Sequence, residues 1–196
     1  SSVLRLLERG RDGLVSETME DGNLSPERAM YRVIGSRREA MAGALLTARK
    51  LGYQAIAINK AIEGEARVVG VNHPERVIVA GQQLMAPRCV VSSGETTVTV
   101  SGGGRGGRNQ ELALAALSEL SRLGSEAVLA SVGTDGVDGP TDAAGAMVDS
   151  TTGLRANAMG LSSPESYLAD NNAYAYFSQL GDLIRTGPTG TNVGDL

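Results

Sequence analysis

Residues 101 to 111, Ser-Gly-Gly-Gly-Arg-Gly-Gly-Arg-Asn-Gln-Glu, form the stretch around which the rest of the chain is organised. The residues before it, Thr96 to Val100, are β-branched and alternate in polarity, which predicts a strand. After it, Leu112 to Leu123 has apolar residues at helical spacing and stops at Gly124, which predicts a helix. A strand, a glycine loop and a helix are therefore expected in succession.

The glycine loop has the composition of an anion-binding site. Five of the six residues from 102 to 107 are glycine, which lets the backbone approach a ligand closely, and the helix start leaves N–H groups unpaired. Arg105 and Arg108 add guanidinium groups that match phosphate and carboxylate geometry. The candidate substrate- or phosphate-binding residues of this loop are Gly104, Arg105, Gly106, Gly107 and Asn109. A flexible linker or hairpin loop is the alternative interpretation.

Two familiar nucleotide-binding patterns fit this loop poorly. Gly102, Gly104 and Gly107 match Gly-x-Gly-x-x-Gly, but the strand before them has the alternation of a half-exposed antiparallel strand. The acid expected at the end of the next strand, Val128 to Val132, is missing. A Walker loop fails as well, because no Lys-Ser or Lys-Thr pair follows the glycines.

Composition excludes several classes of protein. The 196 residues are enough for one large or two small domains, and the net charge of −4 gives no reason to expect a nucleic-acid or membrane partner. Cys89 is the single cysteine, which excludes an internal disulfide framework and favours a cytoplasmic setting. The sequence has neither a signal peptide at its start nor an apolar stretch of membrane-spanning length.

The first half of the chain has the pattern of parallel βαβ units. Strands are predicted at Met30 to Ile34 and at Tyr53 to Ile58, with a helix from Arg37 to about Leu51 between them. A second helix is predicted to start within Glu63 to Arg67 and to kink or end at His73-Pro74.

Ser36 and Arg37 stand where a parallel sheet places ligand-binding loops, and they are the candidate cofactor-binding residues. A helix cap and a solvated charge are the alternative roles. His73 is the single histidine, so a histidine-rich metal site and a Ser-His-Asp triad are not expected, and we expect it at the surface.

The sequence pattern changes near residue 87, where strand-like runs begin, and this change predicts a domain boundary. Arg88 to Ser92 and Thr96 to Val100 resemble two strands joined by a hairpin at Ser93-Gly94-Glu95. We expect residues 1–86 to be the last part of a parallel-sheet domain and residues 87–196 to form a smaller domain with a mixed sheet, both of the α/β class.

Two polar loops follow. Asp135, Asp138 and Asp142 lie in a glycine-rich stretch after a predicted strand, where they could converge on a hard cation or on hydroxyl groups. A solvated turn with helix-capping aspartates is the alternative. The tail from 186 to 195 is rich in hydroxyl groups and glycines. This composition fits either a frayed terminus or a third loop that joins the other two around a polar substrate. The further candidate binding residues of these loops are Thr134, Thr189 and Asn192.

Four blocks in this order resemble the bacterial and archaeal glycerate 2-kinase family, which is also named hydroxypyruvate reductase and whose C-terminal region is called the MOFRL domain. The blocks are Gly-Glu-Thr-Thr-Val-Thr-Val (94–100), Gly-Gly-Arg-Asn-Gln-Glu (106–111), Gly-Thr-Asp-Gly-Val-Asp-Gly-Pro-Thr-Asp-Ala-Ala-Gly-Ala (133–146) and Thr-Gly-Pro-Thr-Gly-Thr-Asn-Val-Gly-Asp (186–195). Residues 1–86 resemble the last part of the family's Rossmann-like N-terminal domain, with Gly-Ser-Arg (35–37) and Glu-Gly-Glu-Ala-Arg (63–67) in place.

The resemblance implies a two-domain enzyme that transfers the γ-phosphoryl of ATP to the 2-hydroxyl of D-glycerate with Mg2+. Arg108 matches the family's active-site arginine. Asp138 is a further candidate catalytic residue and Asp135 and Asp142 are the candidate metal ligands, while the choice of proton acceptor among the three aspartates stays open. The family's partner lysine belongs to the N-terminal domain, most of which is absent here, so we expect this chain to be inactive alone. A nicotinamide-dependent hydroxypyruvate reductase and a non-catalytic binding module stay open as alternatives, as does a homodimer.

Overall fold

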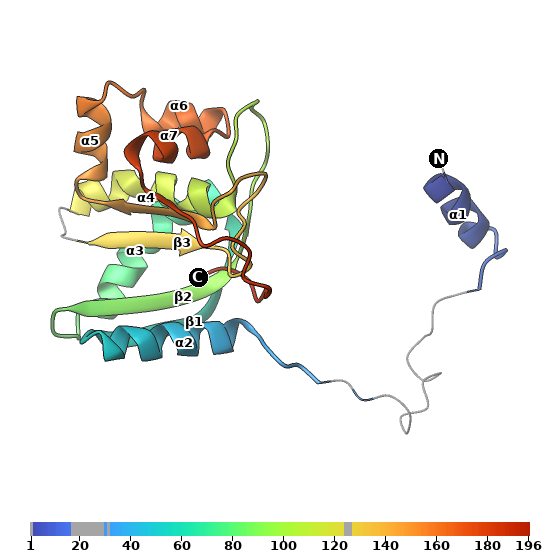
Figure 1. The fold of residues 1–196 in the computed structure, drawn as a ribbon, viewed down its shortest axis with the longest axis horizontal. Coiled ribbons are helices and arrows are strands. Elements are labelled where there is room, and N and C mark those ends of the chain that lie inside the picture. Colours follow the sequence, from blue (N-terminus) through green and yellow to red (C-terminus); the bar gives the residue numbers. More distant parts are fainter. Residues whose placement is uncertain (1, 17–29, 31, 124–126) are drawn as a thin grey trace. The chain divides into compact units, whose positions relative to one another are not determined.

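The structure is a computed structural model that describes residues 2–16, 30, 32–123 and 127–196. The chain divides into two compact units, Ser1–Ile34 and Gly35–Leu196 (Figure 1). The first unit contains helix α1 (Ser2–Arg11), which has no buried residue. The strand predicted at Met30 to Ile34 is wrong for the residues described there, which lie in no strand, while Tyr31 falls outside the described residues.

The second unit begins with helix α2 (Arg37–Lys50) and a parallel βαβ unit. Strand β1 (Gln54–Glu65), helix α3 (Ala66–Gly81) and strand β2 (Arg88–Thr97) follow one another, and β1 pairs in parallel with β2. Helices α2 and α3 lie on opposite sides of this two-stranded sheet (Figure 1). The chain thus contains a parallel βαβ unit, but around α3: the unit predicted around the helix from Arg37 lacks its first strand in the residues that the structure describes.

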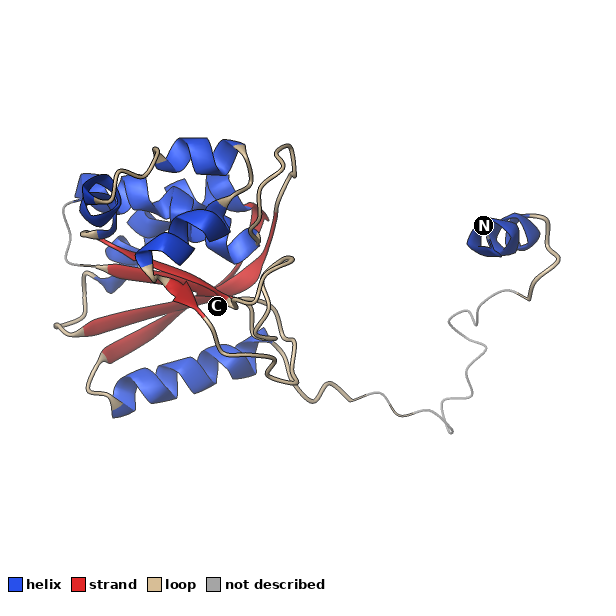
Figure 2. Ribbon diagram, turned by 45° about the horizontal axis from the view of Figure 1, so that its top comes forward, coloured by secondary structure: helices blue, strands red, loops and turns tan. Residues whose placement is uncertain are grey.

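Helix α4 (Arg108–Leu123) leads into an antiparallel sheet of three strands. The strands are β3 (Val128–Val132), β4 (Gly145–Asp149) and β5 (Leu183–Ile184), in the order β3-β4-β5. Three short helices lie between β4 and β5: α5 (Thr152–Ala158), α6 (Pro164–Ala169) and α7 (Ala173–Leu180). Figure 2 shows the strands as a layer between α2 and the group formed by α4 to α7. The α/β class is confirmed.

Helix α4 is the centre of the core. Its residues from Asn109 to Leu117 are all buried, because α3, β4 and the α5–α7 group surround it. Its apolar residues pack with the buried Tyr176 and Phe177 of α7, whose rings meet edge to face. The same burial surrounds its polar first turn, whose side chains must therefore find partners within the protein.

The segment from 88 to 100 differs from the predicted hairpin. Gly94 lies inside β2, where a Cβ atom would come 1.9 Å from the carbonyl oxygen of Ile62, so glycine is needed for close pairing and not for a turn. The pairing continues to Glu65 and Thr97, which makes Glu63 to Glu65 part of a strand. Pro74 lies inside α3, which continues to Gly81; the buried packing around His73 and Pro74 holds the helix together despite the missing N–H group.

Asp195 and Leu196 lie between the two sheets. The N–H and C=O groups of Asp195 pair with those of Gly94 in β2, and those of Leu196 pair with Val132 in β3. This segment therefore joins the parallel sheet to the antiparallel one. The boundary near residue 86 stays a prediction, and β1 and β2 pair across it. None of the helices in the described residues is long and apolar enough to cross a lipid bilayer.

Candidate functional site

The glycine loop packs against the turn between α6 and α7. A Cβ atom at Gly102 or Gly104 would come 2.3 Å from atoms of Asp170 or Asn172, so these glycines allow two backbones to touch. The N–H groups of the first part of the loop are hydrogen-bonded to this turn: Gly104 donates to the carbonyl oxygen of Asp170, and Arg105 donates to the side chain of Asn172. The protein's own chain therefore occupies this part of the predicted phosphate-binding loop.

Asn171 is the centre of that contact. Its backbone is left-handed, with φ of 51°, and its Oδ1 accepts from the N–H groups of Ser101 and Gly102 at 2.7 and 2.8 Å. Its Nδ2 donates to buried Glu111 at 2.6 Å, which also pairs with Arg67. The strand before the loop pairs in parallel with β1, so its alternating polarity was a wrong reason to reject dinucleotide binding. A better reason is that the N–H groups of Gly102, Gly104 and Arg105 already have hydrogen-bond acceptors within the protein.

The N-terminus of α4 is capped by Asp138. Its two oxygens accept from the backbone N–H groups of Asn109 and Gln110 at 3.0 and 2.9 Å, and Asn109 Nδ2 lies 3.2 Å from the same carboxylate. Burial raises the pKa of Asp138, and the hydrogen bonds from Asn109 and Gln110 partly offset this effect. A carboxylate thus occupies the place at the helix start where an anionic ligand was predicted. Asp138 therefore has the helix-capping role that was the alternative interpretation of the acidic loop.

The neighbouring candidates serve the same buried network. Asn109 accepts from Ser131 in β3 at 2.6 Å, and Gln110 donates to Thr141 at 3.0 Å. Gly106 and Gly107 are not among the described residues that line the nearby polar hollow, and Gly107 packs against Asp138. These residues hold the first turn of α4 in place.

A polar cleft lies next to this turn, at the carboxyl ends of β1 and β2, where α/β proteins bind ligands. We call this hollow the polar cleft. The residues that line it are Glu63, Glu95, Thr96, Thr97, Val98, Arg108, Asp135, Val137, Asp138, Gly139 and Asn192. Four of these residues carry carboxylates, and Arg108 is the cationic side chain among them. Of the predicted site residues, the structure brings Arg108, Asp135, Asp138 and Asn192 together here.

Arg108 is held on one side by Asp195. Its Nε and Nη2 donate to the two carboxylate oxygens at 2.6 and 2.9 Å, while Nη1 lies 3.4 Å from Glu95. The Asp195 side chain is 9% exposed and that of Glu95 is 67% exposed, so the first carboxylate is nearly buried and the second is solvated. Hydrogen bonding to Asp195 raises the pKa of Arg108, which keeps the guanidinium charged.

The tail from 186 to 195 is hydrogen-bonded to the acidic loop. Thr189 donates from its hydroxyl to the carbonyl oxygen of Thr134 at 2.6 Å and from its N–H to Asp135 at 3.0 Å. Thr134 in turn donates to Gly194 at 2.7 Å. Thr134 and Thr189 therefore fasten the tail to the acidic loop, while Asn192 reaches the polar cleft.

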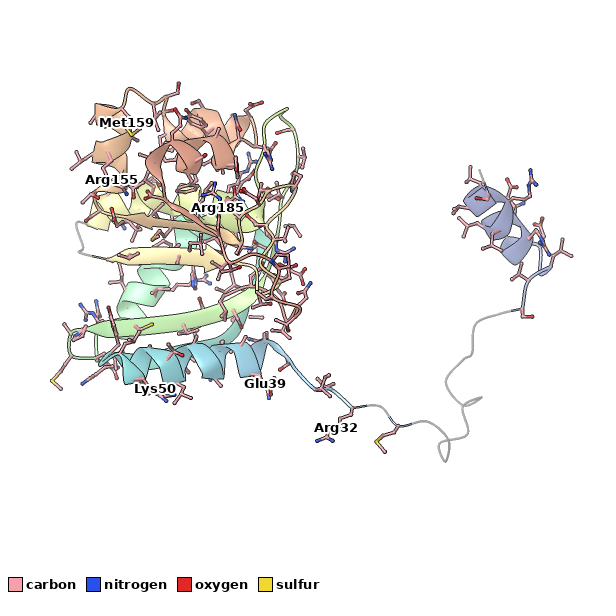
Figure 3. The ribbon with its side chains drawn as sticks, viewed as in Figure 1. Arg32, Glu39, Lys50, Arg155, Met159 and Arg185 are labelled. Atoms are coloured by element: carbon pink, nitrogen blue, oxygen red, sulfur yellow. The ribbon has the colours of Figure 1, made fainter. Side chains whose placement is uncertain are left out.

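The metal pair proposed for the acidic loop does not fit. Asp135 accepts from the N–H of Val137, whereas Asp142 pairs with Arg185 (labelled in Figure 3) at 3.0 Å and accepts from Tyr174 at 2.7 Å. Asp142 is not among the described residues that line the polar cleft. Within residues 2–16, 30, 32–123 and 127–196, no group of three His, Cys, Asp or Glu side chains is arranged to hold a metal ion.

Arg105 belongs to the same surface cluster as Asp142. Its guanidinium carbon lies 4.6 Å from the centre of the Tyr174 ring, and its Nε donates to the carbonyl oxygen of Pro140 at 2.8 Å. Arg105 thus holds the glycine loop to neighbouring residues at the surface. It contacts Tyr174 and Pro140, whereas Arg108 contacts Asp195.

Ser36 and Arg37 connect α2 to the parallel sheet. Ser36 is the N-cap of α2 and accepts from the N–H of Arg38 at 3.2 Å, as in the alternative interpretation. Arg37 is more than a solvated charge, because it donates to Ser93 in β2 at 3.2 Å and to the carbonyl oxygen of Asn59 at 3.1 Å. Neither is among the described residues that line the polar cleft.

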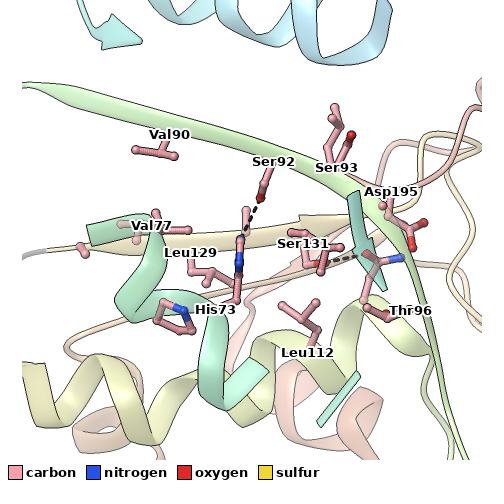
Figure 4. Close-up of a pocket in the computed structure, with 18 of the residues that line it drawn as sticks. His73, Val77, Val90, Ser92, Ser93, Thr96, Leu112, Leu129, Ser131 and Asp195 are labelled. Atoms are coloured by element: carbon pink, nitrogen blue, oxygen red, sulfur yellow. Dashed lines mark hydrogen bonds between the residues drawn. The ribbon is translucent and has the colours of Figure 1, made fainter. Parts of the chain in front are cut away.

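A second hollow, the apolar groove, lies between β2, β3, α3 and α4 (Figure 4). Val77, Val90, Leu112 and Leu129 line it together with His73, whose Nε2 is 2.9 Å from the hydroxyl of Ser92. The prediction that His73 lies at the surface is wrong, since its residue is 8% exposed. The groove offers apolar walls and the polar cleft offers charge, so the polar cleft is the candidate functional site.

His73 predicts a pH dependence of stability. Burial lowers the pKa of His73, and the charge of Arg76 lowers it further. The imidazole therefore takes up a proton at a lower pH in the folded protein than in the unfolded chain, where its pKa is about 6.5. Because the unfolded chain binds more protons, the free energy of unfolding should fall as the pH is lowered from 7.5 to 5.5. Urea unfolding of the wild type and of His73→Gln at both pH values measures it, and equal losses in the two proteins would contradict the expectation.

Together, the buried helix α4, the two small sheets and the polar cleft define an α/β domain with a polar hollow at the carboxyl ends of its parallel strands. The MOFRL family model matches residues 88–195, which is more than half of the sequence. The chain belongs to this family.

Comparison with known proteins extends the likeness to the whole chain. A glycerate 2-kinase of Pyrococcus horikoshii is 38% identical over 199 residues, which covers 100% of this chain and 44% of that protein. The crystal structure of a glycerate kinase from Thermotoga maritima superposes with a TM-score of 0.76 at 41% identity, over 84% of this chain and 40% of the other. A glycerate kinase of Danio rerio is 49% identical over 113 residues, or 55% of this chain and 22% of that protein. The chain therefore spans less than half the length of these relatives.

The structure adds three residues that the sequence did not single out as site residues: Glu95, Asn171 and Asp195. Asp195 and Glu95 lie in two of the four blocks that carry the family resemblance, which was the one available signal for them. The contact of Asp195 with Arg108 joins residues 87 positions apart, and no local pattern encodes it.

Proposed function

We propose that this chain supplies one side of an active site that transfers the γ-phosphoryl group of ATP to the 2-hydroxyl of D-glycerate. The observation that carries the proposal is the polar cleft, where a fixed arginine lies among carboxylates at the carboxyl ends of parallel strands. The glycerate kinase names of the relatives support the substrate and the reaction. The other side of the site would come from an N-terminal domain, which together with this chain we call the two-domain enzyme.

Arg108 would bind the glycerate carboxylate or the transferring phosphoryl group. Nη1 is its accessible edge, because the Glu95 that faces it is solvated and can move aside. Phosphoryl transfer spreads negative charge over the equatorial oxygens, and a fixed guanidinium stabilises that charge. The phosphorus–oxygen bond to ADP breaks as the bond to the glycerate 2-oxygen forms.

Asp135 is better suited than Asp138 to accept the hydroxyl proton. Asp138 already accepts from two backbone N–H groups, while Asp135 lines the cleft and accepts from Val137 N–H through one oxygen, Oδ1. The carboxylates of the cleft outnumber Arg108, so a phosphate-bearing ligand needs positive charge from elsewhere. The resemblance assigns that charge to a lysine of the other domain and to Mg2+, and no step proposed here depends on a metal ion held by this chain.

The test is ADP release by the two-domain enzyme with ATP, Mg2+ and D-glycerate, beside NADH oxidation with hydroxypyruvate and beside this chain alone. Glycerate-dependent ADP release that needs both domains is the expected result. NADH oxidation without ADP release would replace the kinase by a reductase. Ligand binding without either reaction would make this chain part of a non-catalytic module.

A further inference from the structure

We infer that Asp195 is a positioning residue for Arg108: it fixes the guanidinium so that its opposite edge faces the polar cleft. This inference rests on the proposed function for its kinetic consequence, but its geometric part can be tested without any activity.

The hydrogen bonds of the pair fix the plane of the guanidinium. An arginine side chain has several rotatable bonds, and a bidentate carboxylate contact restricts them by forming two parallel N–H···O bonds. Nε and Nη2 of Arg108 make these two bonds with Asp195, at 2.6 and 2.9 Å. The remaining amino group, Nη1, is the one left to meet a ligand.

Asp195 is itself rigidly held. Its N–H donates to the carbonyl oxygen of Gly94 at 2.9 Å, its C=O accepts from the N–H of Gly94 at 3.2 Å, and the next residue makes two bonds with Val132 at 2.9 Å each. The carboxylate therefore sits on a backbone that is tied to both β2 and β3. Such support is what a functional side chain needs to keep one geometry.

Asp195 acts from behind Arg108. Arg108 lines the polar cleft, whereas Asp195 is not among the described residues that line it and instead lines the apolar groove, where Figure 4 labels it. Its side chain is nearly buried and both of its oxygens are used by Arg108. A substrate in the cleft would therefore contact Arg108 and not Asp195.

A second ion pair in the domain serves as the matched control. Arg155 and Asp182 also form a bidentate pair, at 3.0 and 2.8 Å, and the Asp182 side chain is 13% exposed. Neither residue is among the described residues that line the polar cleft. Asp182→Asn should therefore resemble Asp195→Asn in stability while leaving turnover unchanged.

The first measurement is kinetic. Asp195→Asn in the two-domain enzyme should lower kcat by about 10- to 100-fold, the range for removing a group that orients a functional residue, with Asp182→Asn near the wild type. Millimolar guanidinium ion should restore activity to Arg108→Ala, because Asp195 holds the added ion where the side chain was. The rescue should be lost in Arg108→Ala combined with Asp195→Asn. Equal rescue with and without Asp195, or unchanged kcat in a folded Asp195→Asn, would overturn the inference.

The second measurement does not need activity. The Nε–H proton of Arg108, followed by NMR in the same protein, should exchange with water slowly and at least about 10-fold faster in Asp195→Asn, since the acceptor of a short charge-assisted bond is weakened. An unchanged exchange rate would overturn the positioning role. A two-domain enzyme without glycerate-dependent ADP release would instead defeat the proposed function, and the exchange rate would still decide the role of Asp195.

Discussion

Replacing Arg108 by alanine is expected to lower the kcat of the two-domain enzyme with D-glycerate by about 1,000-fold. The physical reason is that a fixed guanidinium among carboxylates is the feature of the polar cleft that can stabilise charge developing on a transferring phosphoryl group. Arg108→Lys should lose less than alanine but remain well below the wild type, because an ammonium keeps the charge and loses the planar fork. Steady-state ADP release at saturating ATP measures both variants.

The control must separate lost chemistry from lost folding, because Arg108→Ala leaves the nearly buried Asp195 without its cation. Thermal unfolding of each variant shows whether the domain is intact at the assay temperature. Arg122→Ala removes another arginine from α4, at its far end, where Arg122 pairs with Glu119 on the surface. It should leave kcat unchanged. Near-normal turnover by folded Arg108→Ala would remove Arg108 from the active site.

The local elements of the fold were predictable from the sequence. The helix from Arg37 with its cap at Ser36, the strand Val128–Val132 and the helix after the glycine loop all follow from short-range periodicity, caps and glycine stops. Arg108 was also predictable, through the block in which it lies. Helix α3 was less so, since its interior proline is tolerated because of tertiary packing around Gly70, His73 and Pro74.

Long-range contacts explain the errors. Glycine in a sequence can mean a turn, a ligand or a touching backbone, and here Gly94 meets Ile62 while Gly102 and Gly104 meet the turn at 170–172. No local pattern distinguishes these cases, because the partner lies about 30 to 70 residues away along the chain. Likewise, an aspartate in a glycine-rich loop fits a metal ligand and a helix cap equally well until the helix that it caps is known.

Asp138 shows how such a contact can be tested by stability. Asp138→Ala is expected to lower the free energy of unfolding by about 2–4 kcal/mol, since it removes a helix cap and leaves buried N–H groups of Asn109 and Gln110 without an acceptor. The free energy of unfolding of Asp138→Asn should lie between those of the alanine variant and the wild type. The amide keeps one acceptor oxygen for one backbone N–H group but turns its NH2 group toward the other. Urea unfolding of the chain measures these differences, provided that the denaturant dependence of the transition stays constant.

Asp142→Ala is the matched control for the same loop. Asp142 pairs with Arg185 at the surface, where its side chain is 59% exposed, so its removal should change stability far less than removal of Asp138. If the two alanine variants lost similar free energy, the buried cap would not be what holds α4 in place. If Asp138→Ala were strongly destabilised, a drop in its activity would be expected from displacement of Arg108, the first residue of the helix, and would not identify Asp138 as a proton acceptor. The stability of Asp138→Ala thus separates the structural role of Asp138 from a chemical one.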